Sequence, residues 1–415
     1  MDQPILFPRF IQVRVEEALT DTPVVLIHGP RQSGKSTLAR LVGDKLGYTY
    51  FSFDDATILA AAREDPAGFV AGLPERIILD EIQRVPELLA TIKLAVDRDR
   101  TPGRFILTGS ANILLIPTLS DSLAGRLEII GLHPLSRCEL LGQPSHFLDA
   151  IFSGTTMALR SERLGDGIAN IVAAGGYPSA LARTTEQRRT KWYLEYVDTI
   201  AQRDVRELAR IRELDALPRL LSLAAAQTAQ LFNLAELAGP FQLSRTTIGE
   251  YVTLLERVFL IHRLAPWHSN RISRLIKTPK MHLGDTGIAC ALLGLTTEEL
   301  RRDRRLLGQL LETFTLQELR RQAGWDATPT LFHHFRHKDG AEVDIVLERG
   351  PGRIAGVEVK LSGTVFGKDF RGLRKLQESV GDRFCAGVVL YDGEEVVRFG
   401  DRLAAVPLRR LWEDR

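Results

Sequence analysis

The stretch PVVLIHGPRQSGKSTLARLV, Pro23 to Val42, decides the fold of the first third of the chain. Its continuous apolar run from Val24 to Ile27 is typical of a strand that is covered on both faces. The turn that follows has the pattern GxxxxGKS and leads into a helical pattern, which is the context that a phosphate-binding loop requires. The sequence therefore predicts an α/β domain that binds a nucleotide on this loop.

The residues of the predicted loop have separate roles. Glycines allow backbone N–H groups to face the phosphates, and the N-terminus of the next helix adds its dipole. We expect Lys35 to reach the β- and γ-phosphates of ATP and the Ser36 hydroxyl to ligate Mg²⁺. The predicted cofactor-binding residues of the turn are Gly29, Pro30, Arg31, Gln32, Ser33, Gly34, Lys35 and Ser36.

Two later strand patterns end in polar groups that suit the same chemistry. RIILDEIQ ends in Asp80 and Glu81, of which the first can hold the Mg²⁺ shell and the second can polarise the attacking water. RFILTGSAN ends in a polar tip whose Ser110 can sense the γ-phosphate. Arg126, in SLAGRLEII, has two interpretations: it stabilises transition-state charge, in its own subunit or a neighbour's, or it forms a surface salt bridge.

The order of these motifs carries a resemblance to a known family. GPRQSGKST, LDEIQ, LTGSAN and GRLEIIGLHPLS, followed by GGYP at Gly175 to Pro178, resemble AAA-type ATPases of a bacterial and archaeal family. Members of that family have a C-terminal domain without an assigned function. The resemblance implies that ATP is bound by Gly34, Lys35, Ser36, Thr37, Asp80 and Glu81. Ser36 replaces the more usual threonine and keeps the hydroxyl that the metal needs.

The middle of the chain has a helical and arginine-rich pattern that suggests DNA binding. Residues 180–280 contain 16 Arg and Lys against 10 Asp and Glu, a local charge of +6, whereas the whole chain has a net charge of +2. Within NLAELAGPFQLSRTTIGEYVTLLERVFLIHRL, Asn233 and Ser244 can cap two short helices of a helix-turn-helix, and the strands that follow can form a wing. Arg245, Arg271 and Arg274 would then contact DNA. A rigid spacer or a dimer contact is the alternative.

The last part of the chain has a helical pattern with Glu312, then three strand patterns, a helix and a strand. This order resembles the PD-(D/E)xK nuclease fold, and the resemblance implies a catalytic set of Asp344, Glu358, Lys360 and, on the helix, Glu312. Carboxylates such as Asp344, Glu358 and Glu312 can hold Mg²⁺ against a phosphate, and Lys360 can orient the water. Val343 precedes Asp344, so the literal Pro-Asp is absent. A surface ion pair within VEVK and a domain that binds without cleaving are the alternatives.

Together these patterns predict three domains in 415 residues. They are an AAA-type P-loop ATPase domain with a helical lid at 1–210, a winged-helix segment at 211–285, and a restriction-endonuclease-like α/β domain at 286–415. No secretory signal or membrane span is visible, and Cys138, Cys290 and Cys385 are isolated, which fits the cytoplasm. The histidines of HHFRH, at 333–337, are expected on a solvated strand face.

The sequence therefore predicts a Mg²⁺-dependent ATPase that is associated with DNA, acts on branched or damaged duplex, and forms a homo-oligomer if Arg126 works across subunits. The alternative is a nucleotide-operated switch or scaffold whose C-terminal domain binds a partner without cleavage. DNA endonuclease activity is left open by the sequence.

Overall fold

A computed structural model of the chain describes residues 6–110, 125–154, 160–205, 216–241, 243–268, 278–350 and 352–414. The chain divides into two compact units. The amino-terminal unit is Arg9–Leu135 with Leu255–Phe259, and the larger unit is Ser136–Leu254 with Leu260–Arg415 and the first eight residues. The boundaries that we expected after residues 210 and 285 both lie inside the larger unit.

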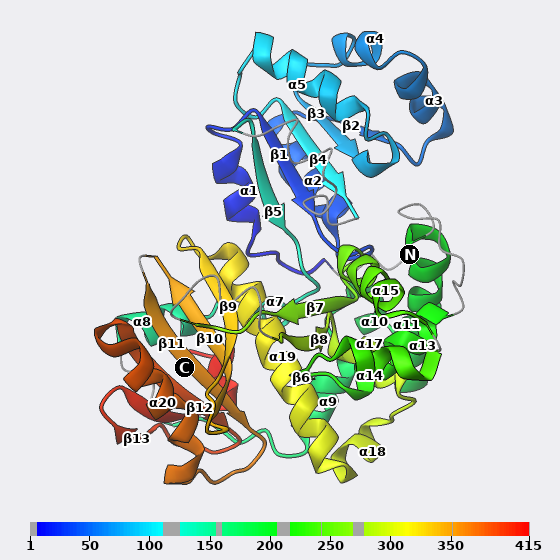
Figure 1. The fold of residues 1–415 in the computed structure, drawn as a ribbon. Coiled ribbons are helices and arrows are strands. Elements are labelled where there is room, and N and C mark those ends of the chain that lie inside the picture. The colour runs from blue at the N-terminus through cyan, green and yellow to red at the C-terminus, as the bar shows by residue number, and fades with distance from the viewer. Residues whose placement is uncertain are drawn as a thin grey trace. The chain divides into compact units, whose positions relative to one another are not determined.

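The amino-terminal unit is built on a parallel sheet with the strand order β2-β3-β4-β1-β5 (Figure 1). Its strands are β1 (Val24–His28), β2 (Thr49–Ser52), β3 (Ile77–Asp80), β4 (Phe105–Gly109) and β5 (Leu127–Gly131). Val24 pairs with both Phe105 and Leu127, so the strands are nearly in register. The expected α/β class is confirmed. Because all five strands are parallel, their carboxyl ends lie along one edge of the sheet.

Helices connect these strands and cover the sheet. They are α1 (Gln12–Ala18), α2 (Lys35–Leu46), α3 (Ala56–Glu64), α4 (Pro66–Ala71), the 3₁₀ turn η1 (Ile82–Arg84) and α5 (Leu88–Arg98). Fully buried side chains of β1, β3, β4 and α5, among them Leu26, Leu79, Leu107 and Ile92, form one core. Burial of such side chains is worth about 1.5–3 kcal/mol each, so this packing holds the carboxyl edge of the sheet rigid.

The larger unit begins with a helical part. Its helices are α7 (Arg137–Leu141), α8 (Phe147–Ser153), α9 (Gly167–Ala174), α10 (Pro178–Leu181), α11 (Glu186–Thr199), the π-helical turn η3 (Ile200–Asp204), α17 (Thr286–Leu292) and α18 (Thr297–Arg302). Within this part lies a segment with the order helix, strand, helix, helix, strand, strand. Its elements are α13 (Ala216–Ala226), β6 (Gln230–Leu231), α14 (Leu234–Ala238) with η4 (Gly239–Phe241), α15 (Arg245–Arg257), β7 (Ile261–Leu264) and β8 (Lys280–Leu283), and its strands pair as β6-β8-β7.

The C-terminal part of the larger unit is a six-stranded mixed sheet with the order β13-β14-β12-β11-β10-β9 (Figure 1). The long helix α19 (Arg304–Trp325) precedes it. The sheet contains β9 (Thr330–Arg336), β10 (Glu342–Arg349), β11 (Arg353–Lys360), β12 (Phe384–Tyr391), β13 (Val397–Gly400) and β14 (Leu403–Pro407), and its connections include η5 (Gly367–Phe370), α20 (Arg371–Val380), η6 (Gly381–Arg383) and η7 (Leu408–Leu411). The expected order of helix, three strands, helix and strand is confirmed for α19 to β12, and β13 and β14 extend it.

The sheet core explains why α20 forms where it does. Leu373, Leu376 and Val380 recur at helical spacing and pack with Val343 and Val389 of the sheet. Strands β10 and β11 form an antiparallel hairpin in which Ile345 faces Val357. The Asp344 side chain, next to Ile345, accepts from the Val359 N–H of β11 at 3.0 Å.

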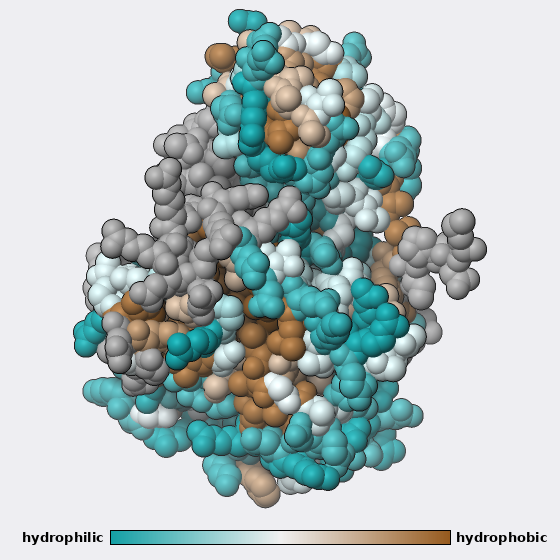
Figure 2. All heavy atoms as spheres, turned by 90° about the vertical axis from the view of Figure 1, so that its right-hand side faces the viewer, coloured by the Kyte–Doolittle hydropathy of each residue, from teal (hydrophilic) through white to brown (hydrophobic). Residues whose placement is uncertain are grey.

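In the described part of the chain, no helix is long and apolar enough to span a membrane. In the lower half of the face drawn in Figure 2, hydrophobic residues gather in the middle and hydrophilic residues line the lower edge. Large hydrophobic side chains that are exposed lie on separate elements, such as Leu94 on α5, Leu194 on α11 and Leu331 on β9. Exposed apolar residues of this scattered kind are normal for a folded domain.

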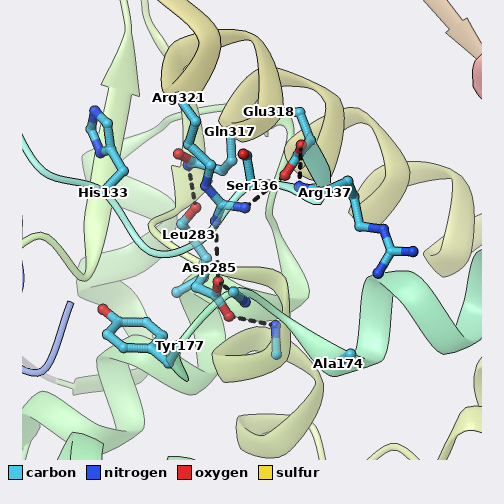
Figure 3. A network of polar contacts seen from close by, with 12 residues as sticks. His133, Ser136, Arg137, Ala174, Tyr177, Leu283, Asp285, Gln317, Glu318 and Arg321 are labelled. Carbon is cyan, nitrogen blue, oxygen red and sulfur yellow. Dashed lines mark hydrogen bonds and ion pairs between the residues drawn. The ribbon is translucent and has the colours of Figure 1, made fainter. Parts of the chain in front are cut away.

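A buried ionic network holds the helical part together (Figure 3). Arg321 of α19 donates to Asp285 at 3.3 Å and to Glu318 at 2.7 Å, and all three side chains are at most 5% exposed. Asp285 caps α17 through the Gly287 N–H at 2.9 Å and also accepts from the Gly176 N–H at 2.8 Å. Burial raises the pKa of Asp285, against the opposing effect of Arg321. One carboxylate thus joins α17, α19 and the loop after α9.

The GGYP motif belongs to this network and has a packing role. Gly175 has a φ of +66°, and a Cβ there would lie 2.2 Å from an Asp285 oxygen, so no other residue fits. Tyr177 is buried against the rings of Trp192, Tyr193 and Tyr196, at centroid distances between 4.9 and 6.1 Å. The motif therefore provides a tight turn at Gly175, next to Asp285, and a buried aromatic side chain at Tyr177.

We predict that Arg321→Met destabilises the larger unit by about 3–5 kcal/mol, because it removes the arginine that is paired with the buried carboxylates of Asp285 and Glu318. The measurement is thermal unfolding together with hydrogen exchange of the Gly176 and Gly287 amides, which bond to Asp285. Arg302→Met is the control, since that side chain is 77% exposed in a surface pair. Equal effects of the two substitutions would contradict the role of the network.

Candidate functional site

The phosphate loop connects β1 to α2 at the carboxyl edge of the parallel sheet. Gly34 has a φ of +100° and Gln32 a φ of +59°, so the turn uses left-handed conformations at two places. Helix α2 begins immediately after it, at Lys35. The Lys35 side chain is buried, and its Nζ donates to the Pro30 carbonyl at 2.9 Å. The lysine head group therefore lies against the loop whose phosphate ligand it is predicted to contact.

Asp80, at the end of β3, lies next to the start of α2. One of its oxygens accepts from the Ser36 hydroxyl at 2.7 Å and from the Thr108 hydroxyl at 2.5 Å. The other oxygen accepts from the Tyr50 hydroxyl at 2.8 Å. Burial and the Asp80 carboxylate raise the pKa of Tyr50, which stays a donor. Hydroxyl and carboxylate oxygens are the ligands that Mg²⁺ prefers, so Ser36 and Asp80 fit this ion.

Glu81 is held by two neighbours. Its backbone has a left-handed φ of +61°, a conformation that costs a residue with a side chain about 1–2 kcal/mol. The carboxylate accepts from the Ser110 hydroxyl at 3.1 Å and from the Gln83 amide, which also donates to Ser110 at 2.9 Å. The structure thus brings together the predicted Glu81 and Ser110 and adds Gln83, which the sequence analysis missed although it stands in the same motif.

Two further residues at the loop were missed by sequence reasoning. Arg9 donates to the Ser33 carbonyl at 2.7 Å and to the His133 carbonyl at 2.6 Å, so it ties the loop to the chain after β5. His28 ends β1, and burial and the nearby Lys35 lower its pKa to about 4. Arg9 stands 20 residues before the first glycine of the motif, and nothing in its local pattern signals the contact.

The remaining predicted residues of this unit lie in different places. Arg31 is half-buried in the loop, and Thr37 is exposed in the first turn of α2. Arg126 precedes β5, at the amino edge of the sheet, where its Nε donates to Asp97 at 2.5 Å. A five-residue strand of about 16 Å separates that edge from the phosphate loop. The structure therefore does not bring Arg126 to the loop of its own chain, and a role on a neighbouring subunit stays a prediction.

In the larger unit, the four residues predicted for nuclease chemistry do come together. Asp344 of β10 accepts from the Val359 N–H at 3.0 Å, and the Lys360 ammonium contacts Glu358 at 2.7 Å. Glu312 of α19 joins them through Lys280 of β8, which the sequence analysis did not consider. The Lys280 ammonium lies 2.8 Å from Glu312 Oε1 and 3.2 Å from Asp344 Oδ1. We call these five residues the carboxylate cluster.

The charges of the carboxylate cluster are strongly perturbed. Burial would lower the pKa of Lys280, but Glu312 and Asp344 outweigh it and the pKa is raised. Burial would raise the pKa of Asp344, but Lys280 and Lys360 outweigh it and the pKa is lowered. Burial and the Asp344 charge raise the pKa of Glu358 to about 8, and the same two effects raise that of Glu312. Asp344 is thus the carboxylate that stays ionised most easily.

Among the residues that the structure describes, no three His, Cys, Asp or Glu side chains are placed so that they could hold a metal ion. The expectation of a solvated histidine face is wrong for His334, which is 2% exposed and whose Nε2–H donates to the Thr278 carbonyl at 3.2 Å. Burial and Lys280 lower its pKa to about 3, so it is neutral.

The predicted DNA-contacting segment is described only in part. Ser244 caps α15, as expected, since its hydroxyl accepts from the Thr247 N–H at 3.1 Å. Ile248, Tyr251 and Val252 form the buried face of that helix, whereas Arg245 is exposed at its start. Arg271 and Arg274 lie outside the described residues.

Comparisons with known proteins agree with the amino-terminal site. Residues 21–141 match the family model described as an AAA domain, so this part of the chain is an AAA-type nucleotide-binding domain. Residues 166–299 and 307–411 match two models described as domains of unknown function, DUF8612 and DUF4143.

The family follows from whole-chain relatives. The uncharacterized protein Rv2008c of Mycobacterium tuberculosis and the uncharacterized protein Mb2031c of Mycobacterium bovis are each 30% identical to this chain over 402 residues, which is 96% of this chain and 83% of each relative. The chain belongs to the same family as these two proteins. Among solved structures, the Walker-type ATPase PABY2304 of Pyrococcus abyssi is 17% identical, with a TM-score of 0.43 over 68% of this chain and 94% of that one, and at this level it carries no inference about function.

We predict that Glu81→Gln keeps nucleotide affinity and loses ATP turnover by about 10²–10⁴-fold, because the amide cannot accept a proton from water. The measurements are binding of a fluorescent ATP analogue and phosphate release. Glu87→Gln is the control, since Glu87 is exposed beyond the same strand. Loss of nucleotide binding in Glu81→Gln would contradict a purely chemical role for this carboxylate.

We also predict a pH dependence of stability that comes from His28. Its folded pKa of about 4 lies below the ordinary value of 6.5, so the unfolded chain binds a proton that the folded chain excludes. Stability from this residue is therefore complete above pH 6.5 and falls as the pH is lowered toward 4, with a limiting slope of about 1.4 kcal/mol per pH unit.

His28→Asn should reduce this acid-side loss in thermal unfolding of the amino-terminal unit. His146→Asn is the control, since His146 is 71% exposed beside Asp414. An unchanged pH profile in His28→Asn would show that the buried imidazole is not the group that titrates.

Proposed function

We propose that the chain is a Mg²⁺-dependent ATPase that acts on DNA, with branched or damaged duplex as its substrate. Lys35 contacts the β- and γ-phosphates, Ser36 and Asp80 hold Mg²⁺, and Glu81 polarises the attacking water. Bound Mg²⁺ would supply neutralisation of the phosphate charge. The observation that carries this proposal is the Ser36 to Asp80 contact of 2.7 Å beside the lysine loop, with Glu81 next in the chain.

Support for DNA as a partner comes from the larger unit. The order of α13, β6, α14, α15, β7 and β8 is the order of a winged helix-turn-helix, with α15 as the second helix of the motif. Its first turn is exposed and carries Arg245. The local charge of +6 over residues 180–280 gives the electrostatic attraction that phosphate backbones require.

A specific observation favours a second candidate, a nucleotide-operated switch. Glu81 is engaged by Ser110 and Gln83, so its carboxylate is occupied by contacts within the chain. A switch of this kind would bind nucleotide tightly, hydrolyse it slowly and pass its state to a partner of the C-terminal part. A homo-oligomer in which Arg126 serves a neighbour's nucleotide, in the cytoplasm, is compatible with both candidates.

The test is ATP turnover with Mg²⁺ measured without DNA and with single-stranded, duplex, forked and four-way DNA. We expect a rate that rises with forked or four-way DNA, disappears in Lys35→Ala, and falls steeply with salt because DNA binding releases counterions. Arg245→Ala should reduce the stimulation by DNA and leave the DNA-free rate unchanged. Arg302→Ala, at an exposed arginine on α18, should change neither.

The outcomes separate the two candidates. Tight nucleotide binding with slow turnover and no response to any DNA would replace the DNA-dependent ATPase by the switch. Retained nucleotide binding and turnover in Lys35→Ala would overturn both.

A further inference from the structure

The carboxylate cluster has a lysine where a nuclease-type arrangement would have a metal ion. Glu312 and Asp344 were both predicted as metal ligands, and the Lys280 ammonium contacts the two carboxylates, at 2.8 and 3.2 Å. The Lys280 side chain is only 6% exposed, and those of Glu312 and Asp344 are 12% and 13% exposed. The ammonium is therefore enclosed by the groups that a divalent cation would need.

The backbone of Lys280 is fixed, so the contact is not made by a loose surface side chain. Lys280 pairs with Leu231 of β6 on one side and with Leu264 of β7 on the other. The residues after Lys280 contact successive positions along α19. His282 contacts Thr313 at 3.0 Å, the Leu283 carbonyl accepts from Gln317 at 2.8 Å, and Asp285 accepts from Arg321 at 3.3 Å. These contacts set the register that brings Lys280 to Glu312.

The residues that follow β7 also pair with β9 of the C-terminal sheet. The Trp267 N–H donates to the His334 carbonyl at 2.6 Å, and the His334 N–H donates to the Ala265 carbonyl at 3.0 Å. Trp267 packs in the core of the C-terminal sheet with Phe335. The segment that carries Lys280 and the strands that carry Asp344 and Glu358 thus form one packed structure.

Charge and geometry make the lysine and a divalent metal exclude each other. Mg²⁺ and Mn²⁺ need several oxygen ligands close to 2.0–2.2 Å, about the metal itself. An ammonium and a dication cannot share the same two carboxylates at contact distance, because their charges repel in a buried site. The second ammonium of the cluster, on Lys360, is already paired with Glu358 at 2.7 Å. The residues present therefore do not fit a divalent metal while Lys280 is in place.

We infer that Lys280 is the built-in cation of the carboxylate cluster, so that the C-terminal part of this chain holds its fold without a divalent metal and does not use metal-dependent phosphodiester cleavage. A lysine tethered in β8 ties the wing segment to α19 and β10 in the way that a bound metal would tie ligands from separate elements. This inference does not depend on the proposed ATPase, because it concerns a different unit and requires neither nucleotide nor DNA.

The test is binding of Mn²⁺ alone to the full chain without nucleotide, measured by electron paramagnetic resonance and calorimetry. Sites elsewhere are subtracted with Asp344→Asn. We expect the wild type to show no Mn²⁺ site that depends on Asp344. Lys280→Ala should gain one such site per chain, at least about tenfold tighter than in the wild type, since removal of the ammonium frees its oxygens.

Stability provides an independent readout. Lys280→Ala should unfold at a lower temperature than the wild type in EDTA and recover in Mn²⁺, whereas the wild type should respond to EDTA and Mn²⁺ no more than Asp344→Asn does. Lys280→Gln, which keeps a donor without the charge, covers the case in which Lys280→Ala does not fold. Lys368→Ala, at an exposed lysine in the same unit, is the matched control and should behave as the wild type.

Two results would overturn the inference. The first is an Asp344-dependent Mn²⁺ site in the wild type that is as tight as the site in Lys280→Ala. The second is a folded Lys280→Ala chain that gains no site, because the ammonium would then not stand in for a metal. Neither result bears on ATP turnover, so this failure is distinct from a failure of the proposed function.

Discussion

A buried charge needs a partner of opposite sign. In the larger unit this constraint sets the position of β8 along helix α19. Lys280 with Glu312 and Asp285 with Arg321 are the two ends of a line of polar contacts between the segment at 280–285 and α19. Nine residues separate Glu312 from Arg321, about 13.5 Å along a helix. A slip of the strand by one residue would leave charges unpaired at both ends, at a cost of several kcal/mol each, so the register has no near alternative.

This line of contacts crosses the boundary that the sequence suggested at residue 285. Turn residues and periodicity mark where elements end, and by those signs a segment with two short helices and a wing ends at residue 285. In the structure, polar side chains join the segment at 280–285 to α19. Polar residues produce no hydrophobic periodicity in the sequence, so this contact could not be predicted from it. The wing segment and the C-terminal sheet consequently belong to one compact unit, in which Lys280 of β8 contacts Asp344.

The sequence was sufficient to predict features that depend on neighbouring residues in the chain. The phosphate loop, Asp80 and Glu81 lie at the ends of parallel strands, and a strand–turn–helix pattern is enough to place them. The order of helix, three strands, helix and strand in the last part of the chain was likewise predicted from local patterns. Contacts such as Arg9 with Ser33 or Tyr50 with Asp80 join segments 24 and 30 residues apart. A single sequence does not encode such pairs in any periodicity, so they emerged only from the fold.

The VEVK motif alone does not decide whether this part of the chain is a nuclease, and the position of Lys280 bears on that question. A half-buried pair of Glu358 and Lys360 at 2.7 Å is compatible with a nuclease and with a plain ion pair. The inference that Lys280 is the built-in cation favours the ion pair. Burial and the Asp344 charge raise the pKa of Glu358 to about 8. A dication added to the cluster would lie beside the ammonium groups of Lys280 and Lys360 in a buried site. On the inference drawn from Lys280, these residues connect β8, α19 and β10 and do not cleave a phosphodiester.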